Sequence, residues 1–162
     1  TSIKITSTIG PNVFVMAHPL ELSRAIQNLF TNAMRYGRSE DGILRLHVNA
    51  GLARDGKNAV LSVGDEGAGL PAAERERVMR PFERGESARS GVTGTGLGLA
   101  IVERIVRRSG GSVQLDDMTP HGLLVRVSFP VTDPEAHKSR EQKLAREQEK
   151  LEKKMLKGQQ KN

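Results

Sequence analysis

The sequence GVTGTGLGL, residues 91–99, is the most informative stretch of this 162-residue chain. It places glycines at positions 91, 94, 96 and 98, directly before a segment with helical apolar spacing. Glycine lets a backbone approach a ligand closely, and a helix N-terminus binds anions through its free N–H groups. The stretch therefore predicts a phosphate-binding loop that opens a helix, with a simple flexible hinge as the alternative. No Lys-Ser/Thr pair follows and no strand comes directly before, so it is neither a P-loop nor a dinucleotide fingerprint.

The segments on both sides alternate between helical and strand spacing of their apolar residues. We expect helices at 19–36, 71–79 and 97–108, and strands at 43–48, 59–63, 112–115 and 123–129. Residues 1–15 are expected to form short strands or an extended lead-in. Gly37 is expected to end the first helix.

The first expected helix carries a polar stripe. At 3.6 residues per turn, Glu21, Asn28, Asn32 and Arg35 fall on one narrow face, beside an apolar face that accounts for the core. Asparagine is a mediocre helix former, so two of them on one face call for an explanation. Their amides and the arginine suit a site for a hard cation and phosphate, although an ordinary solvent-facing surface has the same composition.

A second motif is the turn Asp65-Glu66-Gly67-Ala68-Gly69, which follows an apolar strand. A buried carboxylate at a strand end can accept a hydrogen bond from an exocyclic amine such as adenine N6. Glycines two and four positions later let the backbone turn sharply. By itself the motif is also compatible with an ordinary turn.

Residues 81–94 are rich in Gly, Ser, Arg and Glu around the single aromatic Phe82. We expect a long mobile loop that serves as a lid, anchored by Phe82, with Arg84 and Arg89 able to reach phosphates. A plain surface loop with scattered charges is the alternative.

Composition excludes several classes of protein. The chain has no cysteine and four scattered histidines, which argues against disulfides, thiolate metal sites and a catalytic zinc centre. We see neither a signal peptide nor an apolar run long enough to span a membrane. The net charge of +6 admits an anionic partner, but five aromatic residues are few for stacking on bases, so nucleic acid is not expected as a direct partner.

The charge excess is unevenly distributed along the chain. Residues 133–162 hold nine basic and six acidic side chains and no strand pattern. We therefore expect a folded domain over residues 1–132 and a charged C-terminal tail over residues 133–162. The tail is expected to be a solvated helix, a disordered segment or a partner-docking helix.

Four motifs occur in a fixed order: N-x-x-x-N-A-x-x-Y from Asn28 to Tyr36, D-x-G-x-G from Asp65 to Gly69, P-F-x-R-G at 81–85, and G-T-G-L-G-L at 94–99. Together they resemble the ATP-binding catalytic domain of sensor histidine kinases, a branch of the class that includes gyrase B, Hsp90 and MutL ATPases. The match covers roughly residues 15–130. The stretches at 18–20 and 84–89 look most similar to osmosensor kinases of the EnvZ type.

This resemblance implies a Bergerat-type α/β fold, a two-layer sandwich of a mixed, mostly antiparallel sheet packed on helices. It implies that Asp65 binds adenine N6, that Gly67 and Gly69 shape the base pocket, and that Tyr36 lies beside the adenine or ribose. In many relatives a bulkier or acidic residue stands at position 64, so Gly64 predicts a looser pocket wall.

The resemblance also assigns the phosphate end of the site. Asn28 is implied as the Mg²⁺ ligand, and Asn32 and Arg35 as phosphate-binding residues, so these three would carry the catalysis. The loop residues beside the phosphates would be Gly94, Thr95, Gly96, Leu97 and Gly98. Phe82 and Arg84 would belong to the lid. ATP and Mg²⁺ are thus the implied cofactors.

The implied reaction is transfer of the ATP γ-phosphate to a histidine on a separate helical dimerisation domain, for relay to a response regulator. None of the four histidines of this chain has the sequence setting of that acceptor. The chain is therefore interpreted as a catalytic fragment of a bacterial inner-membrane protein, on its cytoplasmic side. Two alternatives remain: an ATP-hydrolysing conformational switch, and a non-catalytic nucleotide-sensing module.

Overall fold

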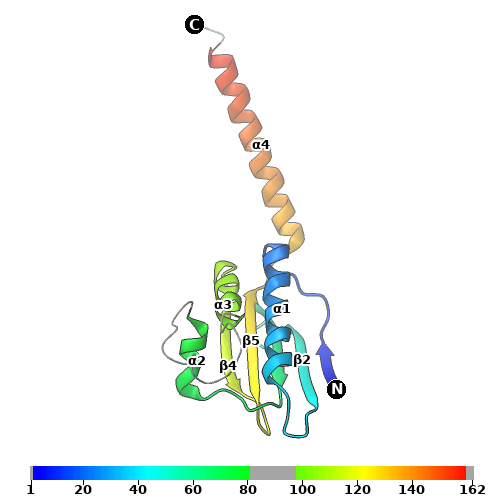
Figure 1. Cartoon of the computed structure of the whole chain (residues 1–162). Coiled ribbons are helices and arrows are strands. Elements are labelled where there is room, and N and C mark those ends of the chain that lie inside the picture. The colour runs from blue at the N-terminus through cyan, green and yellow to red at the C-terminus, as the bar shows by residue number, and fades with distance from the viewer. Residues whose placement is uncertain (1, 81–97, 160–162) are drawn as a thin grey trace. The chain divides into compact units, whose positions relative to one another are not determined.

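The computed structural model describes residues 2–80 and 98–159 (Figure 1). Contacts divide the chain into two compact units, Thr1–Val131 and Thr132–Asn162, which are described separately. Within the described residues, none of the helices is both long and apolar enough to cross a lipid bilayer.

A five-stranded sheet forms one layer of the first unit in the described part of the chain. Its strands are β1 (Ile3–Ile9), β2 (Leu44–Leu52), β3 (Asn58–Asp65), β4 (Ser112–Asp117) and β5 (Leu123–Pro130), arranged in the order β1-β2-β3-β5-β4. The pair β1–β2 is parallel, and the other neighbouring pairs are antiparallel. The expectation of a mixed, mostly antiparallel sheet is confirmed.

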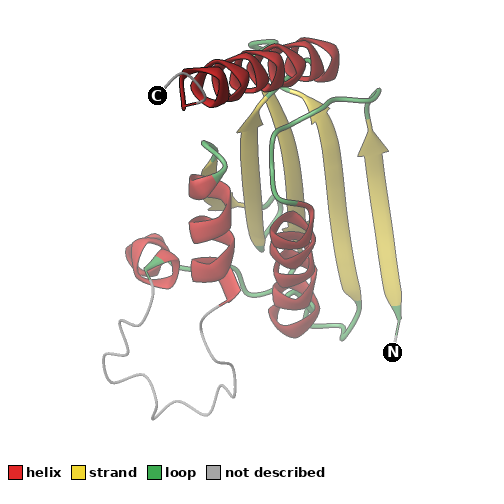
Figure 2. Ribbon diagram, turned by 90° about the horizontal axis from the view of Figure 1, so that it is seen from above, coloured by secondary structure: helices red, strands yellow, loops and turns green. Residues whose placement is uncertain are grey.

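Helices form the second layer (Figure 2). They are α1 (Pro19–Tyr36), α2 (Ala72–Met79) and α3 (Gly98–Arg108), and α1 and α3 lie side by side on one face of the sheet. Buried alternate residues of β5, such as Val125 and Val127, meet Leu29 of α1 and Val102 of α3 in one apolar core. Because each layer can bury its apolar face only against the other, the predicted two-layer sandwich results.

The predicted bounds hold for α1, whereas the central hairpin is longer than expected. Apolar alternation fades after Val48, but β2 continues to Leu52, which pairs with Ala59. The pairing persists because Asp55 closes the turn: its Oδ1 accepts hydrogen bonds from the backbone N–H groups of Lys57 (2.8 Å) and Asn58 (3.1 Å). A side-chain pattern alone does not record such backbone pairing.

Residues 2–15 contain one strand and an isolated bridge. All seven residues of β1 are exposed, since β1 lies at the edge of the sheet and pairs only with β2. Val15 forms an antiparallel bridge with Val131, which ties the segment before α1 to the end of β5.

The second unit contains α4 (Pro134–Gln159). Asp133 caps its start, where Oδ1 accepts a hydrogen bond from the Glu135 N–H at 2.9 Å. Charged pairs at helical spacing, such as Glu149–Lys153 at 2.6 Å, line its surface, and Leu144 and Leu151 are exposed. This is the helical form among the alternatives considered for the charged tail.

Candidate functional site

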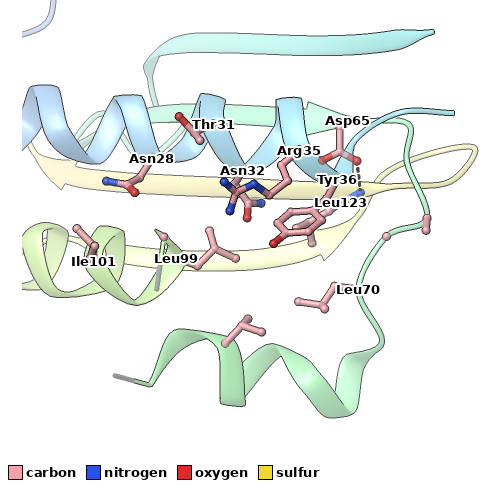
Figure 3. Close-up of a pocket in the computed structure, with 14 residues that line it drawn as sticks. Asn28, Thr31, Asn32, Arg35, Tyr36, Asp65, Leu70, Leu99, Ile101 and Leu123 are labelled. Carbon is pink, nitrogen blue, oxygen red and sulfur yellow. Dashed lines mark hydrogen bonds between the residues drawn. The ribbon is translucent and has the colours of Figure 1, made fainter. Parts of the chain in front are cut away.

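A cavity of about 470 Å³ opens between α1, α2 and α3 (Figure 3). Its size is typical of small-molecule sites. The lining residues come from three helices, the ends of β3 and β5, and the turn after β3. They are Asn28, Thr31, Asn32, Arg35, Tyr36, Asp65, Ala68, Gly69, Leu70, Val78, Gly98, Leu99, Ile101 and Leu123.

One wall of the cavity is the polar stripe of α1. Asn28, Asn32 and Arg35 share a face because they follow the helical repeat, and Figure 3 shows this face turned toward α3. The Asn28 Nδ2 donates to the Arg24 carbonyl at 2.8 Å, which fixes the amide. Its Oδ1 is thereby turned toward α3, 3.5 Å from the position that a Cβ on Gly98 would take. Glu21, two turns earlier, instead pairs with Arg108 at 3.0 Å and does not line the cavity.

Asp65 ends β3, is 4% exposed, and is the only acidic residue among the described residues that line the cavity. Its Oδ1 accepts hydrogen bonds from the backbone N–H groups of Gly67 (3.0 Å) and Leu123 (3.3 Å). Burial raises the pKa of Asp65 above its ordinary value, and the two backbone hydrogen bonds oppose that rise. Since both bonds use Oδ1, Oδ2 can accept a hydrogen bond from a ligand.

Two glycines allow the backbone around Asp65 to close tightly. A Cβ on Gly67 would lie 2.3 Å from the Tyr36 carbonyl oxygen, and a Cβ on Gly122 would lie 1.9 Å from the Asp65 carbonyl oxygen. Gly122 also has φ +116°, which disfavours any other residue. The end of α1, the turn after β3 and the β4–β5 loop are therefore locked together at the carboxylate.

The turn after Asp65 is also held by polar side chains. Glu66 accepts a hydrogen bond from His47 Nε2 at 2.8 Å and lies 3.7 Å from the Arg45 guanidinium. The His121 Nδ1 donates to the Gly67 carbonyl at 3.2 Å. Sequence reasoning missed this bracing, because His47, His121 and Glu66 are far apart in the chain.

Much of the remaining lining is apolar and includes Leu70, Val78, Ile101 and Leu123. None of these residues was expected at the site, because each fits the spacing of a core residue. For Leu70 and Val78, the signal that could have indicated them is that the expected helix beside them is short and only weakly amphipathic. No comparable signal marks Ile101 and Leu123.

Seven of the predicted site residues line the cavity: Asn28, Asn32, Arg35, Tyr36, Asp65, Gly69 and Gly98. Gly67 is not one of the described lining residues, but its backbone N–H donates a hydrogen bond to Asp65. Phe82, Arg84, Gly94, Thr95, Gly96 and Leu97, with the expected lid, lie outside the described residues.

The expectation of a looser wall at Gly64 is wrong. Gly64 alternates with Asp65 along β3, so its open side is the opposite face of the sheet from the cavity. There the Met118 Sδ lies 2.9 Å from the position that a Cβ on Gly64 would take. The Met118 side chain thus fills the space that a side chain at position 64 would occupy.

A divalent cation fits this donor set in one way. Among the described residues there is no group of three or more His, Asp or Glu side chains that could hold a metal. Mg²⁺ commonly takes few protein ligands and completes its shell with phosphate oxygens and water. The oriented Oδ1 of Asn28 fits that pattern.

Comparison with known proteins agrees with the fold. Residues 17–133 match the family model described as histidine kinase-, DNA gyrase B-, and HSP90-like ATPase, and the chain belongs to this family. Within it, the relatives are sensor histidine kinases. CpxA of Escherichia coli K12 is 34% identical over 115 residues, 70% of this chain and 24% of CpxA. MprB of Mycobacterium avium is 39% identical over 114 residues, 70% of this chain and 21% of MprB.

Solved structures place the chain in the same group. The mycobacterial sensor histidine kinase MprB has a TM-score of 0.66 at 30% identity, covering 80% of this chain and 82% of that chain. The kinase domain of the E. coli osmosensor EnvZ has a TM-score of 0.55 at 37% identity, covering 80% and 76%. ShkA, solved in complex with AMPPNP, has a TM-score of 0.63 at 26% identity, covering 80% and 26%.

The chain is therefore an ATP-binding catalytic domain of the sensor histidine kinase type, as the four motifs predicted. It spans about a quarter of the length of the curated relatives it matches.

Proposed function

We propose that this domain binds ATP together with Mg²⁺ and donates the γ-phosphate to a histidine on a separate helical dimerisation domain. One observation carries the proposal: the cavity has a buried carboxylate, Asp65, in one part of its lining and an amide-rich helix face beside the start of α3 in another. A nucleotide has the matching chemistry, an amine-bearing base joined to an anionic phosphate chain.

The base would lie at the Asp65 end. Asp65 Oδ2 would accept a hydrogen bond from adenine N6, and Tyr36 would lie beside the adenine or ribose. Apolar side chains such as Leu70 and Val78 supply surface for a flat ring. A guanine base presents an oxygen where adenine presents the amine, so this arrangement selects ATP over GTP.

The phosphates would lie between α1 and α3. Asn32 and Arg35 would donate hydrogen bonds to phosphate oxygens, and the free N–H groups at the start of α3 would add to them. Asn28 Oδ1 would hold the cation. Bound Mg²⁺ would neutralise charge on the phosphate oxygens during transfer.

The acceptor histidine would come from another part of the parent protein. His47 and His121 are engaged by Glu66 and the Gly67 carbonyl, and they brace the site. We further propose that the parent is anchored in the bacterial inner membrane, with this domain in the cytoplasm and a response regulator as the final phosphate acceptor.

Calorimetric titration of the purified chain with ATP, ADP and GTP, with and without Mg²⁺, tests the binding step. ATP and ADP should bind, Mg²⁺ should strengthen the binding of ATP, and GTP should bind more weakly. A folded chain that ignores millimolar ATP would overturn the proposal.

Labelled ATP tests the transfer step. With the helical domain of the parent protein added, label should appear on its histidine, and no steady hydrolysis should occur without it. Hydrolysis without that partner would favour a conformational switch, and binding without transfer would favour a nucleotide sensor. The pairing of Glu21 with Arg108 argues against the switch, which needs a glutamate to activate water.

A further inference from the structure

Helix α2 packs on the core through partly buried side chains, Val78 and Met79, rather than through fully buried ones. It is eight residues long, it has no fully buried residue, and no side chain caps its start. Short helices are marginal in water and depend on tertiary packing. Nevertheless α2 carries Val78, and Leu70 lies just before it, so this segment forms an apolar wall of the cavity.

Arg75 adds a polar attachment between α2 and strand β4. Its Nε donates to the Leu70 carbonyl at 3.2 Å, and one terminal nitrogen reaches the Leu115 carbonyl of β4 at 3.4 Å. The other terminal nitrogen forms an ion pair with the Asp117 carboxylate, also on β4. The Arg75 side chain is 20% exposed, so its bonds to the two carbonyl groups are partly shielded from water, whereas the Asp117 side chain is 83% exposed and the ion pair is open to solvent.

Arg77 on the same helix is the natural comparison. It pairs with Glu74 within α2 at 3.5 Å, and its side chain is 44% exposed. It therefore contributes local charge without joining α2 to the sheet.

We infer that Arg75 is a positioning residue for nucleotide binding. It holds the wall formed by Leu70 and Val78 at the distance where these side chains contact the base. The inference rests on the proposed function. In Figure 3, Leu70 lies on the far side of the cavity from α1, facing the ring of Tyr36. The guanidinium acts through these side chains and touches no ligand itself.

The inference is tested by nucleotide affinity in matched variants of the full chain. Because the wall contacts the base, Arg75→Ala should weaken ATP, ADP and AMP by the same factor, on the order of tenfold. Arg77→Ala should leave all three affinities unchanged. Arg75→Lys keeps the charge but cannot make three contacts from a planar fork, so it should restore only part of the loss.

A double-mutant cycle identifies the contact to β4. Asp117→Asn should weaken binding in the unchanged chain and should have no further effect in the Arg75→Ala chain. Hydrogen exchange without nucleotide should accelerate at the amides of 72–79 in Arg75→Ala, and stay the same in Arg77→Ala.

Three results would overturn the inference. Equal affinity of Arg75→Ala and the unchanged chain for ATP would refute it while leaving the proposed function intact. A loss confined to ATP with Mg²⁺ would assign Arg75 to the phosphates instead. Failure of the unchanged chain to bind ATP would overturn the proposed function as well. If Arg75→Ala does not fold, Arg75→Lys and Asp117→Asn decide the question by the same criteria.

Discussion

The nitrogen and the oxygen of the Asn28 side-chain amide have different roles. Nδ2 is bound to the Arg24 carbonyl of its own helix, and this bond turns Oδ1 toward the start of α3. A carboxylate at the same position would lack the N–H that fixes the orientation. An asparagine, a weak helix former, is thus placed where an oriented neutral oxygen is useful.

We expect Asn28→Ala to lower the affinity for ATP in the presence of Mg²⁺ by about 10- to 100-fold, the usual cost of losing a well-oriented ligand or its support. Without Mg²⁺ the affinity should hardly change. The melting temperature should stay the same or rise, because the hydrogen bond lost to Arg24 is within the helix and alanine favours helix. Calorimetry and thermal unfolding check both, with the exposed neighbour Gln27→Ala as control.

At Asp65, the ionised carboxylate that suits ATP binding is unfavourable for the stability of the fold. Burial raises the pKa of Asp65 in the folded protein. Because the pKa is raised in the folded state, folding favours the protonated carboxyl group. The stability that this group contributes is fully present below the pKa of the unfolded chain and is lost as the pH rises through the pKa of the folded protein. At neutral pH the ionised carboxylate therefore costs stability.

Asp65→Asn should remove that cost. Urea unfolding without nucleotide should give a free energy of unfolding at pH 7 equal to or above that of the unchanged chain, and the difference should shrink as the pH falls toward about 4. ATP binding should weaken by about 1.5–3 kcal/mol, because an amide N–H₂ replaces the acceptor for adenine N6. A variant less stable at pH 7 but still selective for ATP would contradict both assignments.

The polar part of the cavity could be predicted from the sequence, and its apolar part could not. Asn28, Asn32 and Asp65 are unusual for a helix face or a strand end, so they stand out. Leu70 and Val78 are ordinary apolar residues that also pack partly against the core, so a sequence pattern does not distinguish them from packing residues. Arg75 contacts Leu115 and Asp117, which lie about forty residues later in the chain, and a local sequence pattern does not record contacts over that separation.

Among the elements, α1 ends at a glycine for a reason that the sequence did not indicate. Gly37 has φ −89°, which any residue can adopt, so it is not there for a left-handed turn. A Cβ at this position would lie 2.5 Å from both the Ala33 carbonyl oxygen and the Asp65 Cβ. Gly37 is required because the helix end and the strand end touch.

Gly37→Ala should therefore destabilise the fold by about 1–3 kcal/mol, the usual cost of overpacking, and should weaken ATP binding by displacing Asp65. Gly51→Ala is the control, since its nearest neighbour to an added Cβ lies at 3.6 Å, an ordinary contact. Denaturant unfolding of both variants measures the difference. Equal stability of the two would show that the helix end shifts freely.

The expected elements were largely those observed, with differences at their ends. Apolar periodicity reports which face is buried, and it identified α1 and β5 nearly to the residue. It fails where backbone pairing continues without it, as along β2 from Asn49 to Leu52. Sheet order was not derivable from spacing, because it depends on which strands meet after folding.

For the whole molecule, the core belongs to the first unit. The buried cluster that joins sheet and helices extends no further along the chain than Phe129. The bridge from Val15 and the hydrogen bond from Val131 N to the Lys57 carbonyl (2.9 Å) complete that unit. Among the residues whose burial is described, helix α4 supplies none to the core.

A chain that ends after Asp133 should consequently fold and bind ATP with an affinity within a factor of about two of the full chain, as expected for independent parts. Thermal unfolding and calorimetry of the two lengths check this. A truncated chain that unfolds at markedly lower temperature would show that residues beyond 133 stabilise the first unit.

The edge position of β1 has a mechanical consequence. A pull on the N-terminal end of the chain loads the β1–β2 hydrogen bonds first, because β1 is attached to the sheet through β2 alone. No residue that lines the cavity belongs to either strand. Tension applied at that end can therefore detach β1 from β2 residue by residue, while the cavity between α1, α2 and α3 keeps its shape.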